Sequence, residues 1–262
     1  GSYRADAVEK LPSDDAGNPL ARESESYYRF SGTQLECLKK VWLEPSRGML
    51  NEEFYSMPGL GALYSRASTY VFGDWNKCGE LMGLAPYGRR DQVKSLVSME
   101  NGELRVPSWS ADFKQPYFMG AGDWEKHPAM QHWEDLAWRV QDDTENVLLA
   151  RARWLREKTG TKNLCIAGGV ALNCVANGRI AREGGFESVW IQPAAGDDGI
   201  AIGCAYYGWL EVLKQRRTYV MEHAYTGRTY GEHEIVNALQ RPLVRIQITP
   251  VRSDDICRDT AR

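Results

Sequence analysis

Two turns in the second half of the chain carry residue types that suit anion and metal binding. The first, residues 167–173, reads Ala-Gly-Gly-Val-Ala-Leu-Asn and follows a short apolar segment. Gly168 and Gly169 permit backbone angles that other residues avoid, and they let a ligand come close to the main chain. A helix that starts here presents unpaired N–H groups that attract anions, and Asn173 in its first turn adds a side-chain amide. A plain strand-to-helix turn would use the same residues, so both interpretations remain open.

The second turn, residues 193–199, reads Pro-Ala-Ala-Gly-Asp-Asp-Gly and also follows an apolar segment. The adjacent carboxylates of Asp197 and Asp198 could bind a hard cation, or one of them could cap the following helix. Ligands of parallel α/β sheets gather beyond the carboxyl ends of the strands. We therefore expect both turns to lie at the same edge of a sheet.

A third segment, residues 79–88, reads Gly-Glu-Leu-Met-Gly-Leu-Ala-Pro-Tyr-Gly. Its three glycines and one proline predict an irregular backbone. Glu80 could accept a hydrogen bond from a ribose hydroxyl. A tight loop between helices, with Glu80 in solvent, explains the segment equally simply.

The first two turns lie in a pattern of short strands and helices. We predict strands at 164–167 and 188–191, and helices at 171–184 and 199–214. Strand, helix, strand and helix joined by short turns are typical of a parallel α/β layer covered by helices.

The rest of the chain predicts a hairpin, several helices and loops. The predicted elements are a loop at 1–20, a β-hairpin at 22–30 and 33–42, a helix at 61–72, a glycine-rich loop at 74–90, a short helix near Arg90, an irregular insertion at 99–128, a long helix at 130–159, a helix at 231–240, a strand at 243–249 and a further helix from 253. Arg151 interrupts the apolar stripe of the long helix, which fits a side chain that snorkels to water.

Composition excludes several classes of protein. With 262 residues, 43% hydrophobic and 26% charged, the chain is long and apolar enough to fold as one large or two small domains. A net charge of −3 leaves no overall basic surface for nucleic acid, and no apolar run is long enough to span a membrane. The chain starts without Met and ends in an apparent helix, which favours a piece of a longer protein.

The cysteines and histidines point to neither a disulfide scaffold nor a zinc site. The six cysteines form no C-x-x-C pair, and the four histidines stand at no ligand spacing from them. We expect reduced, buried thiols in a cytoplasmic protein.

Three motifs, in this order, strongly resemble those of the O-carbamoyltransferases of natural-product and nodulation-factor biosynthesis. They are Met82 to Gly88 (Met-Gly-Leu-Ala-Pro-Tyr-Gly), Gly168 to Gly178 (Gly-Gly-Val-Ala-Leu-Asn-Cys-Val-Ala-Asn-Gly) and Pro193 to Gly203 (Pro-Ala-Ala-Gly-Asp-Asp-Gly-Ile-Ala-Ile-Gly). Leu60 to Ser65 (Leu-Gly-Ala-Leu-Tyr-Ser) looks like a further motif of that family. The resemblance covers residues 22–262.

The resemblance implies a fold and an activity. The fold is an α/β domain of the actin-like ATPase (ASKHA) class with a parallel or mixed sheet flanked by helices, similar to the tRNA threonylcarbamoyl transferases and followed by a YrdC-like domain. The enzyme would use carbamoyl phosphate and ATP to make a carbamoyl-adenylate, then transfer the carbamoyl group to a hydroxyl of a small-molecule acceptor. A divalent metal, typically Fe²⁺, would help to hold the nucleotide and to polarise the transferred group.

The resemblance also implies roles for individual residues. The nucleotide contacts that it implies are Gly79, Glu80, Gly168, Gly169 and Asn173. Asp197 falls on a metal-ligand aspartate, and no catalytic residue can be named. Many members carry a Lys just before the Met-Gly-Leu-Ala stretch, where Glu80 stands nearby, so this chain departs from the pattern there.

Two further motifs of the family are absent from the sequence, namely an upstream histidine-rich metal motif and a downstream Phe-Gly-Pro-Arg-Ala-Leu-Gly motif. We therefore expect residues 1–128 to be part of a first actin-like subdomain, 129–230 a second one that carries the nucleotide and metal turns, and 231–262 a connection toward a YrdC-like domain. One aspartate cannot replace a metal site with several ligands, so we expect this chain alone to be inactive.

Two other functions fit the residues. One is an enzyme like the tRNA threonylcarbamoyl transferases, or a sugar-kinase relative of the same fold, although the charge of −3 weighs against tRNA. The other is a module without catalysis that binds a nucleotide or a partner protein.

Overall fold

The computed structural model describes residues 22–32, 34–43, 59–100, 103–105 and 129–239. The chain divides into two compact units, residues 1–213 and 214–262. In the described part of the second unit the regular element is α7 (Glu232–Leu239), which confirms the predicted helix there. The strand and helix predicted after residue 240, and the loop predicted at 1–20, lie outside the described residues. The expected three-part division of the chain stays a prediction.

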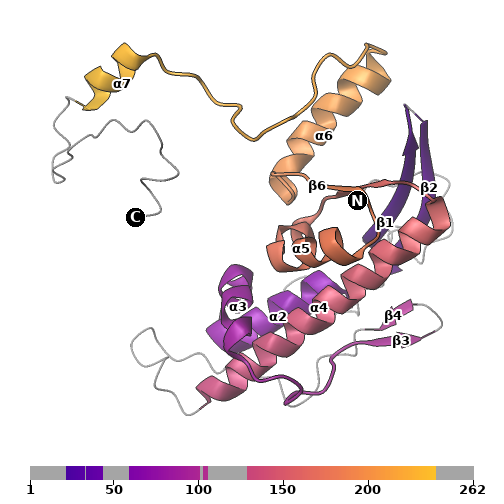
Figure 1. Cartoon of the computed structure of the whole chain (residues 1–262), viewed down its shortest axis with the longest axis vertical. Helices are drawn as coiled ribbons and strands as arrows, with labels where there is room; N and C mark the ends of the chain where they lie inside the picture. Colours follow the sequence, from indigo (N-terminus) through magenta and orange to yellow (C-terminus); the bar gives the residue numbers. More distant parts are fainter. Residues whose placement is uncertain (1–21, 33, 44–58, 101–102, 106–128, 240–262) are drawn as a thin grey trace, which may run out of the picture. The chain divides into compact units, whose positions relative to one another are not determined.

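The first unit is built around one long helix, α4 (Met130–Thr159), whose 30 residues span about 45 Å (Figure 1). It ends where Gly160 takes a left-handed conformation, with φ at 66°, and donates its N–H to the Arg156 carbonyl. Glycine adopts this conformation without a steric penalty, so the predicted helix stops at the predicted residue.

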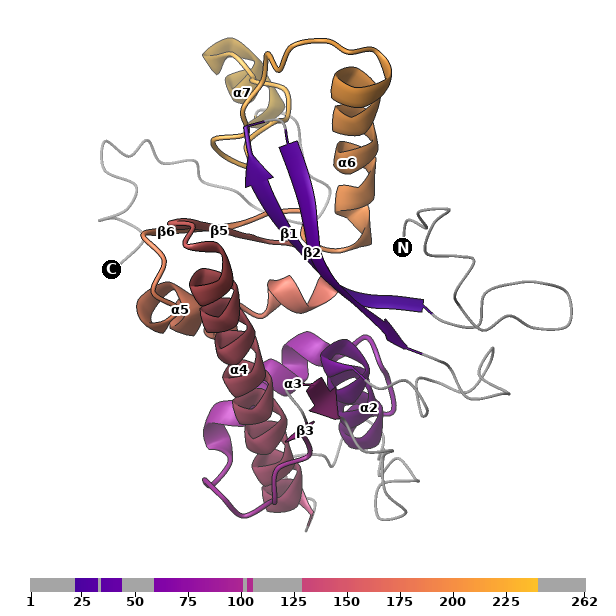
Figure 2. The ribbon, with the colours of Figure 1, turned by 90° about the vertical axis from the view of Figure 1, so that its right-hand side faces the viewer.

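Helices α2 (Leu60–Phe72) and α3 (Cys78–Leu84) pack against α4 and form the larger hydrophobic core. Its fully buried side chains include Leu63 from α2, Leu81 from α3, and Trp133 and Leu136 from α4. Figure 2 shows both shorter helices beside α4. This core holds the α2 and α3 backbones in place.

The predicted parallel strand–helix–strand unit is confirmed. Strands β5 (Asn163–Ile166) and β6 (Ser188–Ile191) pair in parallel, with Asn163 opposite Ser188 and Ile166 opposite Ile191. Helix α5 (Cys174–Glu183) connects them, and its Ile180 packs with Leu164 and with Ala152 of α4 in a second, smaller core. The chain is thus a mixed α/β structure whose described strands form two-stranded sheets.

The hairpin prediction is also confirmed. Strands β1 (Arg22–Ser31) and β2 (Gln34–Leu43) pair antiparallel. Tyr27 of β1 meets Trp154 of α4 edge to face, with ring centroids 5.3 Å apart. The expectation that Arg151 snorkels to water is wrong, because its Nε lies 3.7 Å from a Glu25 carboxylate oxygen and its side chain is only 12% exposed.

Between α2 and α4 the sequence predictions need correction. The predicted loop at 74–90 contains α3 and a 3₁₀ turn, Ala85–Tyr87, because Leu81 and Leu84 find buried places in the core. Packing of this kind outweighs the low helix propensity of glycine. The predicted insertion at 99–128 begins with a short hairpin, β3 (Ser98–Glu100) and β4 (Glu103–Arg105), and residues 106–128 lie outside the described part.

The prediction of a short helix near Arg90 is wrong, because residues 90–97 form turns and bends. Side chains of α4 hold the backbone of this segment. Arg139 donates to the Val93 carbonyl, and the Asp143 carboxylate accepts the Leu96 N–H. These bonds replace the ones that a helix would make within itself.

Two predicted helices start or end differently from expectation. The helix expected at 171–184 begins at Cys174, after a 3₁₀ turn at Gly169–Leu172. The helix expected at 199–214 is α6 (Ile200–Tyr207) continued by a π-helical segment, Gly208–Val212. Within the residues that the structure describes, no helix is both long and apolar enough to cross a bilayer.

The turn after α3 lies directly on α4 at Gly88. A Cβ atom there would stand 2.2 Å from the Glu134 carbonyl oxygen and 2.5 Å from the Trp138 Cβ. The side chain is therefore excluded by close contact with the helix backbone. Gly83, five residues earlier and within α3, has open space around its Cα.

We predict that Gly88→Ala destabilises the chain by about 1–3 kcal/mol, because the turn must move away from α4. Gly83→Ala is the matched control and should stabilise α3 by about 0.5–1 kcal/mol. Thermal unfolding of both variants measures the difference. Equal stabilities would contradict the close contact at Gly88.

The same turn is tied to α4 by Asp135, whose side chain is buried. Its Oδ1 accepts the Arg89 N–H at 2.8 Å, and its Oδ2 accepts from Arg89 Nη2 at 2.7 Å. Burial alone would raise the pKa of Asp135, but the hydrogen bonds and charge of Arg89, with a bond from Gln131, hold that pKa below its ordinary value.

Asp135 should therefore stabilise the fold when it is ionised. We predict that Asp135→Asn costs about 1–3 kcal/mol at pH 7. The difference from wild type should shrink as the pH falls below about 4, through the lowered pKa of the folded state, because the wild-type carboxylate is then protonated too. Urea unfolding at pH 7 and pH 3 tests this, with the exposed Glu157→Gln as the control. A difference independent of pH would refute the role of charge.

Candidate functional site

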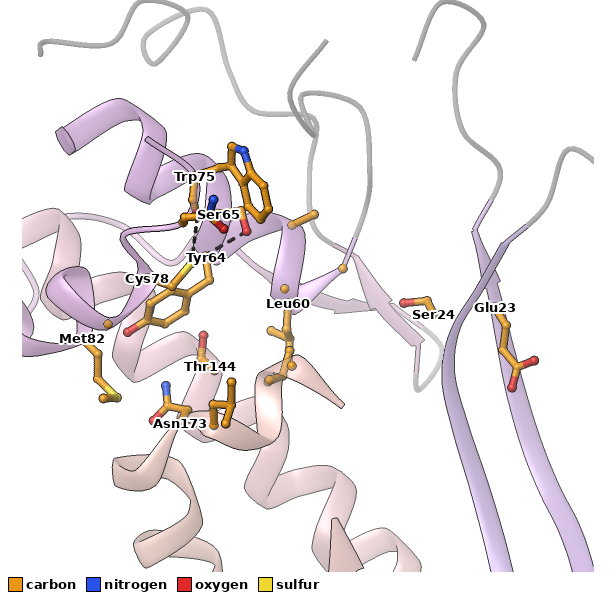
Figure 3. Close-up of a pocket in the computed structure, with 18 residues that line it drawn as sticks. Glu23, Ser24, Leu60, Tyr64, Ser65, Trp75, Cys78, Met82, Thr144 and Asn173 are labelled. Atoms are coloured by element: carbon orange, nitrogen blue, oxygen red, sulfur yellow. Dashed lines mark hydrogen bonds between the residues drawn. The ribbon is translucent and has the colours of Figure 1, made fainter. Parts of the chain in front are cut away.

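A cavity of about 690 Å³ opens between α2, α3, α4 and the turn before α5 (Figure 3). Its lining residues are Glu23, Ser24, Gly59, Leu60, Gly61, Ala62, Tyr64, Ser65, Trp75, Asn76, Cys78, Gly79, Met82, Thr144, Gly169, Val170, Leu172 and Asn173. Cavities of about 300–1,000 Å³ with mostly apolar walls and a few polar groups are typical of small-molecule sites.

The wall of the cavity combines apolar and polar side chains. Leu60, Trp75 and Met82 bring large apolar side chains from α2 and from the segment around α3. The polar groups Thr144 and Asn173 come from α4 and from the start of α5. The cavity can therefore contact a flat apolar group and also offer hydrogen bonds.

Asn173 is the N-cap of α5 rather than a residue of its first turn. Its Oδ1 accepts the Ala176 N–H at 3.0 Å, which satisfies one of the unpaired donors of the helix start. Asn173 Nδ2 donates to Gln141 Oε1 at 2.9 Å. The carboxamide is thus held between the helix backbone and α4, at the wall of the cavity.

The two glycine-containing turns lie side by side, as predicted. The Gly168 N–H donates to the Ala195 carbonyl at 2.7 Å, which joins the ends of β5 and β6. Gly168 has φ at 105° and ψ at 160°, a conformation that is open essentially to glycine alone. A second cavity, of about 320 Å³, lies beside the first and is lined by Gly168 and Gly169.

The structure brings together some of the predicted nucleotide contacts and not others. Gly79, Gly169 and Asn173 line the larger cavity, and Gly168 lines the smaller one. Glu80 is exposed on α3 and lines neither of these two cavities. Its predicted contact with a ribose stays a prediction.

Asp197, the predicted metal ligand, is exposed in the 3₁₀ turn Asp197–Gly199 that leads into α6. Within the described ranges, no three His, Cys, Asp or Glu side chains come close enough together to hold a metal ion. Asp197 with its described neighbours therefore does not make a complete metal site, and its role as one ligand stays a prediction.

Two titratable groups of the cavity wall, the Tyr64 hydroxyl and the Cys78 thiol, favour their neutral forms. Burial, above all, raises the pKa of the Tyr64 hydroxyl, and the nearby Cys78 and Glu145 add to this effect. Burial likewise raises the pKa of the Cys78 thiol, although hydrogen bonds from Ser65 and Ser68 oppose it. A thiol that keeps its proton is a poor nucleophile, so these groups suit binding rather than covalent catalysis.

Residues 25–206 match the family model described as the carbamoyltransferase N-terminus. The chain belongs to the carbamoyltransferase family. The motifs that resembled the O-carbamoyltransferases lie within this match, and Leu60–Ser65, Met82 and Gly169–Asn173 supply wall residues of the larger cavity.

Several curated proteins are similar to this chain. The uncharacterized protein sll1178 of Synechocystis is 37% identical over 214 residues, which cover 74% of this chain and 35% of the relative. The nodulation protein NolNO of Sinorhizobium fredii is 31% identical over 191 residues, or 70% of this chain and 28% of the relative. The nodulation protein NolO of Bradyrhizobium diazoefficiens is 30% identical over 214 residues, or 77% and 37%. The chain spans about a third of the length of these relatives.

Several residues at or behind the cavity wall carry little signal in the sequence. In the sequence Tyr64 belongs to the Leu60–Ser65 motif and to the apolar pattern of the helix predicted at 61–72, and no motif contains Gln141 or Glu145. A signal for Gln141 does exist, because an uncharged polar residue stands beside Val140 on the apolar face of a long helix.

The backbone of the Gly168–Gly169 turn can be tested directly. We predict that Gly168→Ala destabilises the chain by about 1–3 kcal/mol, because alanine cannot adopt the observed φ without strain. Gly169→Ala should change stability little, since open space surrounds its Cα and its φ is ordinary. Thermal unfolding of both variants measures this, and equal losses would contradict the observed backbone.

Proposed function

We propose that this chain carries the nucleotide-binding part of an O-carbamoyltransferase. The enzyme would use ATP and carbamoyl phosphate, through a carbamoyl-adenylate, to transfer a carbamoyl group to a hydroxyl of a small-molecule acceptor. The family membership of the chain supports transfer of a carbamoyl group. The adenylate route, the donor and the kind of acceptor are part of the proposal.

The observation that carries the proposal is the larger cavity. In it the Gly169–Asn173 turn faces an apolar wall that contains Trp75 and Met82. An adenine ring would pack on this apolar wall, and the sugar and phosphates would lie at the glycine-containing turn. Because Asn173 already caps the start of α5 and the Gly168 N–H already donates to the Ala195 carbonyl, we place the phosphate contact at the main-chain N–H of Gly169.

Further features of the sequence belong to the same proposal. The actin-like ATPase fold would place the parallel strand–helix–strand unit next to the nucleotide. Asp197 would provide one ligand of a divalent metal, Fe²⁺ in our proposal, and Glu80 would reach the ribose when the nucleotide is bound. The protein would act in the cytoplasm, where ATP and carbamoyl phosphate are available.

The two glycines of α3 offer a sharp test of nucleotide binding. Both have open space around the Cα, but only Gly79 lines the cavity. We predict that Gly79→Leu fills part of the cavity and weakens ATP binding at least tenfold, whereas Gly83→Leu leaves the affinity within about twofold of wild type. Isothermal titration calorimetry with ATP measures both.

Two outcomes would overturn the proposal. If the wild-type chain bound no ATP, the cavity could not be a nucleotide site. Equal affinities of the Gly79→Leu and Gly83→Leu variants would place ATP elsewhere on the chain.

A further inference from the structure

We infer that Gln141 and Glu145 of α4 form a positioning pair for the nucleotide site, and that they set the hydrogen-bonding direction of Asn173 and Tyr64. The inference rests on the proposed function, because it says how two wall residues of that cavity meet the ligand. Neither member of the pair lines the cavity. Both would therefore act through the residues that do.

Gln141 is buried, with 6% of its surface exposed, and each polar atom of its side chain makes two hydrogen bonds. Its Oε1 accepts from the Tyr64 hydroxyl at 2.7 Å and from Asn173 Nδ2 at 2.9 Å. Its Nε2 donates to Glu145 Oε1 at 2.8 Å and to Asn173 Oδ1 at 3.1 Å. These four bonds use the full capacity of a primary amide.

Glu145 determines the orientation of the Gln141 amide, that is, which neighbours its nitrogen and its oxygen face. An ionised carboxylate can only accept hydrogen bonds, so the nitrogen of Gln141 must face Glu145 and its oxygen must face Tyr64. Arg179 of α5 is the charge partner of this carboxylate, with its Nη1 3.5 Å from Glu145 Oε2. The spacing of four residues puts Gln141 and Glu145 on the same face of α4.

Two neighbours fix the orientation of the Asn173 carboxamide. The Ala176 N–H requires an acceptor, which directs Oδ1 of Asn173 toward the start of α5. The Gln141 amide pairs with Asn173 in a two-bond arrangement that is correct only for this orientation. The carboxamide of Asn173 is therefore locked before any ligand arrives.

The pair also determines whether the Tyr64 hydroxyl acts as a hydrogen-bond donor or acceptor toward a ligand. Tyr64 gives its single hydroxyl proton to Gln141, so its oxygen can act only as an acceptor toward a further partner. Figure 3 shows the Tyr64 hydroxyl and Asn173 on the same side of the cavity. The matching group on the ligand is a donor, such as a ribose hydroxyl or the amino group of adenine.

Charge variants of the pair test the inference. Gln141→Glu sets two carboxylates one helical turn apart and removes both donors, so ATP affinity should fall at least tenfold. Glu145→Gln lets the Gln141 amide turn over and should lower affinity about threefold to tenfold. The double variant Gln141→Glu/Glu145→Gln restores a hydrogen bond between positions 141 and 145 but not the donor to Asn173 Oδ1, so it should recover less than half of the loss on a logarithmic scale.

Asp143→Asn is the matched control for a purely structural effect. Asp143 is buried on the same helix, but its partners are Ser95, Leu96 and Arg139, away from the cavity. This variant should lower the melting temperature while ATP affinity stays within about twofold of wild type. If Asp143→Asn and Gln141→Glu weakened ATP binding equally, the positioning role would be overturned.

A readout without ligand separates this inference from the proposed function. The side-chain amide protons of Asn173 should exchange slowly with solvent in wild type and at least tenfold faster in Gln141→Glu, as followed by NMR. Equal exchange rates would overturn the positioning role. Wild type that binds no ATP but shows slow exchange would overturn the proposed function and leave the locked amide established.

Discussion

Helix α4 is the element on which the rest of the described first unit depends, because both hydrophobic cores are built against it. Its first half packs on α2 and α3 through Trp133 and Leu136, and its second half packs on β5 and α5 through Ala152. The cavity lies where these two regions meet. A shift of α4 along its axis would therefore change the distance between the wall that contains Met82 and the wall that contains Asn173.

The buried face of α4 is not uniformly apolar, and its polar residues organise the segments around it. Asp135 holds the turn after α3, Arg139 and Asp143 hold residues 91–97, and Gln141 holds Tyr64 and Asn173. A buried polar group costs free energy unless it is hydrogen-bonded. Each of these side chains therefore favours one arrangement of the neighbouring loop. Apolar contacts alone would specify that arrangement less strictly.

The regular elements could be predicted where local patterns are strong. The 3.6-residue periodicity of α4, the glycine that ends it and the strand–helix–strand order after it were sufficient. The predictions for α3 and for the segment after Arg90 were wrong because tertiary contacts outweigh local propensity there. In α3 the burial of Leu81 and Leu84 overcomes two glycines, and after Arg90 side chains of α4 replace helical hydrogen bonds.

For the candidate site, the sequence by itself determined the family and the residues of the motifs, because those signals are contiguous in the chain. Only the tertiary structure decided that Gly79 and Asn173 share a cavity, and that Glu80 and Asp197 lie outside it. It also revealed Gln141, whose partners Tyr64 and Asn173 are 77 and 32 residues away in the chain. Hydrogen bonds over such separations leave no periodic pattern, since they depend on how helices pack rather than on neighbouring residues.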